Sequence, residues 1–386
     1  MSCRRQKEEF NASLDRIRKE TEIQRVAFQS VLLDNSASRR EELILKIQNF
    51  ILKIVKCAAN DEIPSIKVNR RFQWKDSEFN ERLSLKPRNE TSCQHIKFTS
   101  HERRFVIICC LLRSIHRLLL SRSSVTKREL YYERTELFGS QTTVNTAVLD
   151  ICDLLQASLW ELRVLSTSKG LVAGNLTIVT ADREVIDFSK PGGVLVPQDV
   201  NGILKIKSSA KFILIVEKDA AFQKLLDDGA HVRLGPCIII TGKGEPDINT
   251  RLFVCRLSRE LAIPGLILVD ADPYGIEIMC TYRFGSLTMI QHSAELAAPE
   301  LRWVGLHPTD IQRLAIPTVP LTSLDFAKAR ELSRRPYIVQ DEQLLEQVNW
   351  LLENGRKSEI ENLTACSQTF LTDMFLPHKI TARNVI

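Results

Sequence analysis

Three acidic residues follow strand-like apolar runs in the second half of the sequence. Glu217 directly follows the run 212–216, and Asp270 and Asp272 follow the run 265–269. Side chains two residues apart in an extended segment point to the same face, so Asp270 and Asp272 are expected to lie together. Ligands bind at the carboxyl ends of strands in open α/β sheets, where a neighbouring strand can place Glu217 beside the two aspartates.

Three carboxylates in one crevice repel each other unless a cation lies between them. Ligands that are all oxygens favour a hard ion, and Mg²⁺ is the expected one where a phosphate shares its coordination. The alternative is that each acid only caps a helix, because Asp is common at helix starts. The occurrence of all three acids at strand ends favours a metal site formed by Glu217, Asp270 and Asp272.

The adjacent residues Tyr131 and Tyr132 lie in the segment 126–134, which is predicted to be a short helix. A phenol with a pKa of about 10 is a weak nucleophile at neutral pH, so it must lose its proton as it attacks. Arg128 precedes Tyr132 by four residues and shares its helical face, where a guanidinium would stabilise both a phenolate and a phosphorane-like transition state. Composition alone favours a core position over a catalytic role for a helical tyrosine.

A glycine-rich loop, residues 241–247, follows the apolar run 237–240. Its Gly242-Lys243-Gly244 sequence could bring backbone amides near a phosphate. The loop lacks the Gly-Lys-Ser/Thr ending of a nucleotide P-loop, so it does not indicate an ATPase. A tight turn between a strand and a helix explains the glycines equally well.

The elements that must position these residues change character along the chain. From residue 210 onward, strand-like runs alternate with helical stretches, which predicts an α/β domain with a mostly parallel sheet. The preceding region is predicted to contain helices at 102–122, 126–134 and 142–156, then strands at 162–166 and 171–179. Three helices and a hairpin form a winged helix-turn-helix, whose third helix commonly enters the DNA major groove, although such domains also bind proteins.

The first 98 residues are predicted to form a helical arm and a polar connector. The segment 41–57 carries apolar residues at helical spacing, namely Leu43, Ile44, Ile47, Ile51 and Ile54. Such a helix is stable only if its apolar stripe packs against its own domain or another protein. The polar stretch 67–101 is predicted to be a poorly ordered connector. The expected multidomain α/β architecture is therefore an arm with connector at 1–98, a winged helix at 99–205, and an α/β domain at 206–386.

The composition is that of an ordinary globular protein, with 386 residues and a formal net charge of +6. This small excess of basic residues suits a polyanion-binding protein without identifying one. The N-terminus is charged where a signal peptide would be apolar, and the best membrane candidate, 105–120, is interrupted by Arg113, His116 and Arg117. The ten cysteines form no Cys-x-x-Cys pair, which favours reduced thiols in the cytosol or nucleus over structural zinc.

Several segments together resemble the A-subunit family of topoisomerase VI. The sequence Val-Thr-Lys-Arg-Glu-Leu-Tyr-Tyr at 125–132, followed by Leu-Phe-Gly-Ser-Gln at 137–141, resembles the catalytic-tyrosine motif of this family. Its wing motif resembles 166–174, and its metal-binding Toprim domain resembles 216–220, 241–247 and 269–275. Within the family, the likeness is closest to the eukaryotic branch that makes meiotic DNA double-strand breaks. The match runs in order from about residue 99 to the C-terminus.

The resemblance implies a reaction at a composite site. Tyr132 would attack the DNA backbone and remain joined to a 5′ end, with Tyr131 as a structural neighbour. Glu217, Asp270 and Asp272 would hold Mg²⁺ near the scissile phosphate. Two copies of the chain would be required, because the tyrosine of one copy meets the metal site of the other. The phosphotyrosyl link conserves the bond energy, so cleavage by this type IIB topoisomerase-like protein would need no ATP.

The same resemblance implies partners and further contacts. Expected partners are double-stranded DNA, a second copy of the chain, meiotic accessory proteins and a topoisomerase VI B-like subunit, on nuclear chromosomes and away from membranes. The candidate phosphate contacts, each of which could instead be a surface charge, are Lys127, Lys169, Lys243, Arg251 and Arg283. Two other interpretations remain open: a non-catalytic DNA-binding or scaffolding paralogue, and another Toprim chemistry such as that of a primase or small nuclease.

Overall fold

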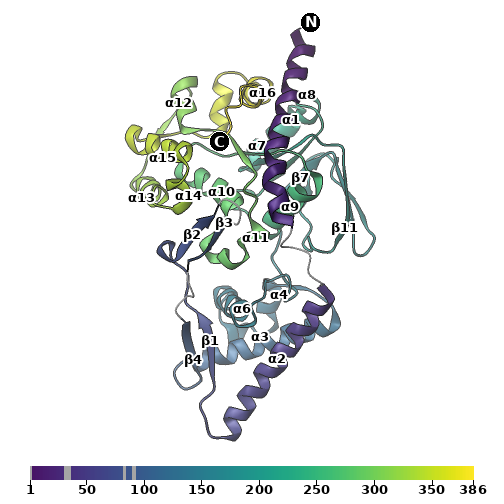
Figure 1. Cartoon of the computed structure of the whole chain (residues 1–386), viewed down its shortest axis with the longest axis vertical. Helices are drawn as coiled ribbons and strands as arrows, with labels where there is room; N and C mark the ends of the chain where they lie inside the picture. Colours follow the sequence, from purple (N-terminus) through teal and green to yellow (C-terminus); the bar gives the residue numbers. More distant parts are fainter. Residues whose placement is uncertain (1, 30–35, 81–83, 89–92) are drawn as a thin grey trace. The chain divides into compact units, whose positions relative to one another are not determined.

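The computed structural model describes residues 2–29, 36–80, 84–88 and 93–386. They form two compact units, and Figure 1 labels many of their helices and some of their strands. We call residues 1–30, 77–86 and 168–386 the sheet unit, and residues 31–76 and 87–167 the tyrosine unit. The chain passes repeatedly from one unit to the other, so neither unit is a single stretch of sequence. This division differs from the predicted domain boundaries at 98/99 and 205/206.

Helices form most of the tyrosine unit. The three predicted helices are confirmed within one residue at each end, as α3 (Glu102–Ser121), α4 (Lys127–Glu133) and α6 (Gln141–Leu155). The helix predicted around 41–57 is α2 (Ser36–Ala59), and α5 (Thr135–Phe138) adds one short turn. Helix α3 forms because its apolar residues recur at helical spacing and are buried together. They are Phe105, Ile107, Ile108, Leu111, Leu112, Ile115, Leu118 and Leu119.

The prediction of a poorly ordered connector over 67–101 is wrong for the residues that the structure describes; 81–83 and 89–92 lie outside them. Strands β1 (Ser65–Asn69) and β4 (Cys93–Lys97) pair antiparallel in the tyrosine unit. Their few apolar residues, Ile66, Val68 and Ile96, are all buried. Alternation with polar residues gives each strand one inward face, and the overall polarity of the stretch conceals this period of two.

The second half of the connector contributes to the sheet unit. Strands β2 (Ser77–Asn80) and β3 (Ser84–Pro87) form a two-stranded sheet. Phe79 of β2 packs edge-to-face against Phe284 and Tyr337, with ring centroids 5.0 and 6.1 Å away. A single aromatic residue thus fixes this strand against the sheet unit, a contact between residues about 200 positions apart that local sequence patterns cannot reveal.

The two strands predicted to form the wing do not pair with each other. Strand β6 (Val164–Leu165) pairs parallel with β5 (Val125–Thr126), which precedes α4. Strand β7 (Leu171–Gly174) instead joins the large sheet, where it pairs antiparallel with β10 (Val194–Leu195) and β13 (Cys237–Thr241). The expected hairpin is therefore wrong. Strand β7 is apolar on successive positions, which suits an interior strand better than an exposed wing.

The core of the sheet unit is a six-stranded mixed sheet of order β10-β7-β13-β12-β14-β15. Strands β12 (Phe212–Val216), β13, β14 (Gly265–Leu268) and β15 (Arg302–Gly305) run parallel, so the predicted parallel sheet is confirmed for these four strands. All residues of β12, β13 and β14 are buried, as expected for strands covered on both faces. Helices α7 (Asp219–Asp227), α9 (Ile248–Leu261) and α10 (Pro273–Phe284) follow β12, β13 and β14.

Helix α1 (Ser2–Gln29) belongs to the sheet unit rather than to a separate arm. Phe10, Leu14 and Ile17 lie on one helical face and are buried in the same core as β12 and β13. The rings of Phe10 and Phe212 pack edge-to-face, with centroids 6.1 Å apart. Helix α1 is therefore held by contacts with residues that come about 200 positions later.

The remaining elements complete the sheet unit. A three-stranded sheet is formed by β8 (Leu176–Thr180), β9 (Val185–Asp187) and β11 (Ile203–Ser208), and β16 (Val319–Pro320) pairs with β17 (Arg356–Lys357). The other α-helices are α8 (Ala230–Arg233), α11 (Ser293–Leu296), α12 (Pro308–Leu314), α13 (Ser323–Leu332), α14 (Pro336–Val339), α15 (Glu342–Asn354) and α16 (Leu376–Thr381). No helix of the described residues is both long and apolar enough to cross a bilayer.

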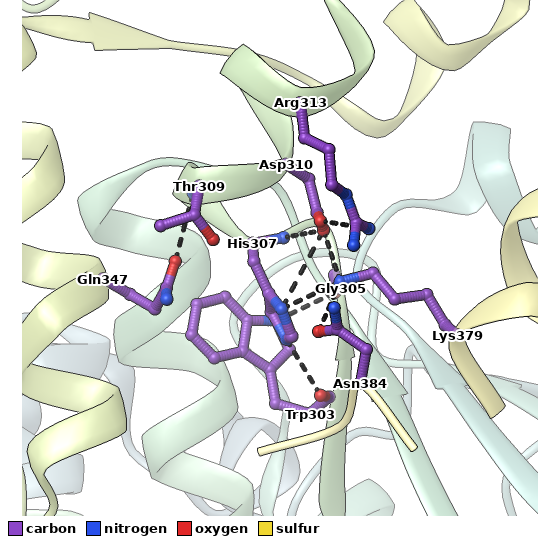
Figure 2. A network of polar contacts seen from close by, with 9 residues as sticks. All are labelled: Trp303, Gly305, His307, Thr309, Asp310, Arg313, Gln347, Lys379 and Asn384. Carbon is purple, nitrogen blue, oxygen red and sulfur yellow. Dashed lines mark hydrogen bonds and ion pairs between the residues drawn. The ribbon is translucent and has the colours of Figure 1, made fainter. Parts of the chain in front are cut away.

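A buried polar network joins α16 to α12 and β15 (Figure 2). The ammonium group of Lys379, fully buried, donates to Asp310 at 2.6 Å, His307 Nδ1 at 2.9 Å and Asn384 at 3.2 Å. His307 Nε2 lies 3.0 Å from the carbonyl oxygen of Trp303. Burial, together with the charge of Lys379, lowers the pKa of His307 to about 4, so the imidazole is neutral and accepts from Lys379. These three bonds replace the three hydrogen bonds that the Lys379 ammonium would donate to water if it were exposed.

Candidate active site

The two strand-end acids Glu217 and Asp270 meet, as the sequence predicted. Strands β12 and β14 are parallel neighbours with Val216 opposite Leu268, so the residues that follow them lie side by side. The backbone N–H of Asp270 donates to Glu217 Oε2 at 2.9 Å. Glu217 is 8% exposed and Asp270 is 3% exposed. Two carboxylates are therefore buried at the carboxyl edge of the sheet, and one of them accepts a hydrogen bond from the backbone of the other residue.

Asp272 is the N-cap of α10. Its Oδ1 accepts from the backbone N–H of Gly275 at 2.7 Å, and Pro273 occupies the first turn. The helix-cap alternative is thus correct for Asp272, although capping leaves this residue beside the other two acids. Gly275 is required by a close approach, because a Cβ there would lie 2.4 Å from the carbonyl oxygen of Asp270. The glycine lets the first turn of α10 pack directly on the acidic segment.

Burial and the negative charge of a neighbouring carboxylate raise the pKa values of all three acids. Burial and the nearby charge of Asp270 raise the pKa of Glu217. Burial also raises the pKa of Asp270, although the hydrogen bond from Lys218 opposes this effect, and burial raises the pKa of Asp272 against the bond from Gly275. Each acid also feels the negative charge of at least one other carboxylate. A cation bound among them would remove this repulsion.

Lys218 is a site residue that the sequence analysis missed. Its ammonium group lies 2.7 Å from Asp270 Oδ2 and 2.9 Å from Glu359 Oε2. Burial alone would lower the pKa of Lys218, but the hydrogen bonds to Asp270 and Glu359 outweigh it and raise the pKa. The only available signal was its position directly after Glu217 in a lysine-containing motif.

The C-terminal part of the chain also returns to the acidic edge. The backbone N–H of Ile360 donates to Asp270 Oδ1 at 2.8 Å, and Ala271 forms an isolated antiparallel bridge with Ser358. Lys357 of β17 forms an ion pair with Asp325 at 2.8 Å, and its positive charge lowers the pKa of Asp272 against the larger effect of burial. Nothing in the sequence pattern links residues 357–360 to Asp270, so this wall of the site could not be predicted.

The chemistry of the acids fits a hard divalent cation such as Mg²⁺, since Glu217, Asp270 and Asp272 offer only oxygen ligands. As they stand, no group of three or more His, Cys, Asp or Glu side chains in the described chain is arranged to hold a metal ion. Both oxygens of Asp270 are already engaged, by Lys218 and by the backbone of Ile360. A carboxylate oxygen has two lone pairs, so a metal that binds Asp270 either replaces the Lys218 ammonium at Oδ2 or shares an oxygen with one of these two donors.

The affinity for Mg²⁺ is expected to rise with pH. Because their pKa values are raised, the three acids stay protonated at pH values above about 4, where ordinary carboxylates have lost their protons. A metal that binds must displace these protons. Each displaced proton makes the affinity rise by up to about tenfold per pH unit, so binding at about pH 5.5 is much weaker than at about pH 8. A titration with Mg²⁺ at several pH values, in buffers of different ionisation enthalpy, measures both affinity and proton release. Equal affinities at both ends of this range would contradict the raised pKa values.

The glycine-rich loop brings two of the candidate phosphate contacts together. Asp247 caps α9 and also accepts from the backbone N–H groups of Lys169 and Gly170, at 3.1 and 3.4 Å. The Lys169 ammonium donates to the carbonyl oxygen of Lys243 at 3.2 Å, and the Lys243 ammonium lies 3.3 Å from Asp219. The backbone N–H of Gly244 donates to the carbonyl oxygen of Glu217. Lys169 and Lys243 therefore lie at the acidic edge.

The two arginines among the predicted phosphate contacts are buried. Arg251 is 4% exposed and donates to the carbonyl oxygen of Leu296 and to Ser286, while Arg283 is 5% exposed and lies 4.8 Å from the centre of the Phe284 ring. Burial lowers the pKa of Arg251, and it lowers the pKa of Arg283 to about 10. Both guanidinium groups are largely covered by protein in this structure, which does not favour a DNA contact at either residue. Their helices are buried on most sides, which a basic residue type does not reveal.

Tyr132 lies on α4 in the tyrosine unit and is 61% exposed. Arg128 is also exposed, one helical turn earlier, whereas Tyr131 is half-buried with its ring centroid 5.4 Å from that of Tyr132. Glu133 fixes the helix to α3 by accepting from Ser114 at 2.7 Å and from Arg117 at 3.0 Å. The nucleophile predicted from the sequence is therefore accessible on an anchored helix. Lys127, in contrast, is half-buried, and burial lowers its pKa.

A capping box begins α4. Thr126 accepts from the backbone N–H of Glu129 at 3.1 Å, and the Glu129 carboxylate accepts from the backbone N–H of Thr126 at 2.5 Å. We expect Thr126→Ala to destabilise the protein by about 1 kcal/mol and to loosen the helix that carries Tyr132. Hydrogen exchange of the amides in α4 measures this loosening. Thr126→Ser keeps the hydroxyl and should exchange like the wild type; equal exchange in Thr126→Ala would show that the cap does not hold α4.

Comparison with known proteins decides the family. The family model for the Toprim domain of the topoisomerase 6 A-subunit and Spo11 matches residues 212–380, and the model described as "Type IIB DNA topoisomerase" matches residues 103–164. The chain is 39% identical to meiotic recombination protein SPO11 of Mus musculus over 345 residues, which cover 88% of this chain and 87% of the mouse protein. The chain belongs to the topoisomerase 6A/Spo11 family.

Other members of the topoisomerase 6A/Spo11 family show a comparable extent of similarity. Meiotic recombination protein W68 of Drosophila melanogaster is 40% identical over 284 residues, covering 72% of this chain and 82% of the fly protein. The DNA topoisomerase 6 A-subunit of Arabidopsis thaliana is 34% identical over 305 residues, covering 78% and 70%. The Toprim model covers the residues of the acidic edge and the type IIB topoisomerase model covers Tyr132, so both groups of candidate residues lie in matched regions.

Proposed function

We propose that this protein breaks double-stranded DNA by transesterification, with Tyr132 as the nucleophile, and that these breaks initiate meiotic recombination. The observation that carries the proposal is the exposure of Tyr132 on a capped and anchored helix, together with a buried acidic edge in the same chain. Relatives named as meiotic recombination proteins and as topoisomerase subunits support the same conclusion. The proposed place of action is the nucleus, on chromosomes.

In the proposed reaction, the phenolic oxygen of Tyr132 bonds to phosphorus as the bond from phosphorus to the 3′ oxygen breaks. The phenol releases its proton and the departing 3′ oxygen takes one up, so the products are a 5′-phosphotyrosyl link and a 3′-hydroxyl. Arg128 lies one turn from Tyr132 and stabilises the phenolate and the charge on phosphorus. No ATP is consumed, because the phosphodiester energy is kept in the new ester.

Glu217, Asp270 and Asp272 are the proposed holders of Mg²⁺. When bound, the ion supplies electrophilic stabilisation of the phosphate oxygens at the break. Lys169 and Lys243, which lie at the same edge, contact the DNA backbone and orient it. Their ammonium groups contribute affinity without reading sequence, so cleavage positions depend on DNA shape, chromatin and partners.

Helices α3, α4 and α6 are proposed to form a helix-turn-helix-like DNA-binding domain that presents Tyr132 to the duplex. We further propose that the chain acts as a homodimer, in which the tyrosine of one protomer meets the acids of its partner, so each composite site cuts one strand. Meiotic accessory proteins and a topoisomerase VI B-like subunit are the proposed partners that assemble this dimer.

The test is to isolate the protein from cells in meiosis and label the 3′-hydroxyl ends of any DNA attached to it. The proposal expects labelled DNA that remains with the protein through denaturation and is released by proteolysis. Attachment must be to 5′ ends, since the 3′ ends are free to be extended. A protein that carries no label in cells that do make breaks would be a non-catalytic member of the family.

A further inference from the structure

Lys218 forms ion pairs with three carboxylates at the acidic edge. Its ammonium lies 2.7 Å from Asp270 Oδ2, 2.9 Å from Glu359 Oε2 and 3.6 Å from Glu361 Oε2, and Glu217 precedes it in the chain. Asp270 is the buried partner, with a side chain 4% exposed, whereas Glu359 and Glu361 are 62% and 38% exposed. The lysine thus bridges an inner acid and two outer acids.

The outer acids offer Lys218 a second position. Glu361 Oε2 is buried and has no hydrogen-bond partner among the described residues, and at 3.6 Å it is just beyond hydrogen-bond distance from Lys218. A small movement of the ammonium away from Asp270 would complete a bond to Glu361 while keeping the one to Glu359. A long, flexible lysine side chain that is 30% exposed can make this movement without a change in the backbone.

We propose that Lys218 is an internal counter-cation of the acidic site, which holds Asp270 until a divalent metal binds and then moves to Glu359 and Glu361. This inference deepens the proposed function and rests on its metal site. The ammonium takes the place of a cation at Asp270 Oδ2, which balances a buried carboxylate that would otherwise be uncompensated. The two outer glutamates then keep the lysine satisfied after the metal arrives.

Two opposite effects on metal affinity follow. In Lys218→Met, the metal no longer competes with an ammonium, and a nearby positive charge is lost, so we expect the affinity to increase by about tenfold or more. In the double variant Glu359→Gln/Glu361→Gln, the second position is lost and Lys218 remains on Asp270, so we expect the affinity to decrease by about the same factor. If the glutamates act through the lysine, their substitution should have a much smaller effect in the Lys218→Met background.

The experiment is a titration of the full-length protein, without DNA, with Mn²⁺ as the probe and electron paramagnetic resonance of the free ion as the readout. Lys218→Arg is the conservative variant, which keeps the positive charge and should bind nearly as the wild type does. Lys224→Met is the matched control, because Lys224 is 31% exposed, forms an ion pair with Asp228 at 2.6 Å and lies on α7. Circular dichroism of each variant verifies that the comparison is made between folded proteins.

The outcomes separate this inference from the function on which it rests. A wild-type protein that binds no Mn²⁺, with the same result for Lys218→Met, overturns both the metal site and the role of Lys218. A wild type that binds, with an unchanged or weaker affinity in Lys218→Met, overturns the counter-cation alone. Should Lys218→Met fail to fold, the double glutamate variant decides: affinity equal to or higher than that of the wild type overturns the proposal, and a tenfold decrease that Lys218→Gln abolishes supports it.

Discussion

Replacing Tyr132 by phenylalanine is expected to abolish the covalent link between the protein and DNA. The substitution removes one oxygen, the proposed nucleophile, from a ring that is 61% exposed, so it leaves no buried polar group unpaired and no cavity. The capping box of Thr126 and Glu129 and the bonds that anchor Glu133 are untouched, and α4 should fold as before. In cells undergoing meiosis, the end-labelled DNA that precipitates with the protein should fall to background.

Tyr131→Phe is the matched control for this prediction. Tyr131 is adjacent to Tyr132 but half-buried, and its loss of one oxygen should leave the labelled DNA at the level of the wild type. Arg128→Lys should reduce the label without abolishing it, because an ammonium keeps the charge but loses the planar guanidinium geometry. If Tyr132→Phe retains the label and Tyr131→Phe loses it, our assignment of the nucleophile is wrong.

Replacing Lys379 by methionine is expected to destabilise the sheet unit by about 1–3 kcal/mol, because the buried carboxylate of Asp310 loses a hydrogen bond and one of its two counter-charges, while Arg313 remains 2.7 Å away. The side chain of Lys379 is fully buried, its ammonium lies 2.6 Å from Asp310, and methionine has nearly the same length but no charge (Figure 2). His307 would also lose the donor to its Nδ1 atom. Chemical denaturation followed by circular dichroism measures the free energy of unfolding.

Two further variants separate a buried charge from an ordinary ion pair. Arg233 and Asp373 form a pair 2.6 Å long whose side chains are 44% and 40% exposed, so Arg233→Met should cost no more than about 1 kcal/mol. In the double variant Lys379→Met/Asp310→Asn, the carboxylate charge that lost the ammonium is removed as well, so part of the lost stability should return. A loss in Lys379→Met no larger than that in Arg233→Met would mean that the network contributes little to stability.

The sequence predicts the acids well, because their placement depends on a local rule. Residues that follow parallel strands meet at one edge, and this rule brings Glu217 and Asp270 into contact across positions that are far apart in the chain. Residues 357–361 follow no such rule, since they reach Asp270 through a loop and an isolated bridge. Lys218 lies next to Glu217 in the sequence, but its role depends on these outer glutamates and cannot be inferred without them.

The differences between prediction and structure also have physical causes. The charge of Arg251 and Arg283 suggests phosphate contact, yet their helices are packed on several sides, and burial depends on neighbours from distant parts of the chain. The overall polarity of the stretch 67–101 suggests disorder, whereas three buried apolar residues, Ile66, Val68 and Ile96, are sufficient to form the pair β1 and β4. The predicted wing hairpin does not form, because strands pair where their apolar residues can be covered and β7 finds its partners in the large sheet.

Because the sheet unit is built from separate stretches of sequence, it cannot finish folding while the early part of the chain is still on the ribosome. Phe10, Leu14 and Ile17 are synthesised early, but the core that buries them contains Phe212 and residues of α16. At translation rates of about 5–20 residues per second, roughly 10–40 s pass between the synthesis of the apolar face of α1 and the synthesis of Phe212. During this interval it is exposed to solvent and to other chains. Production of this protein should therefore depend on chaperones that bind the emerging N-terminal helix.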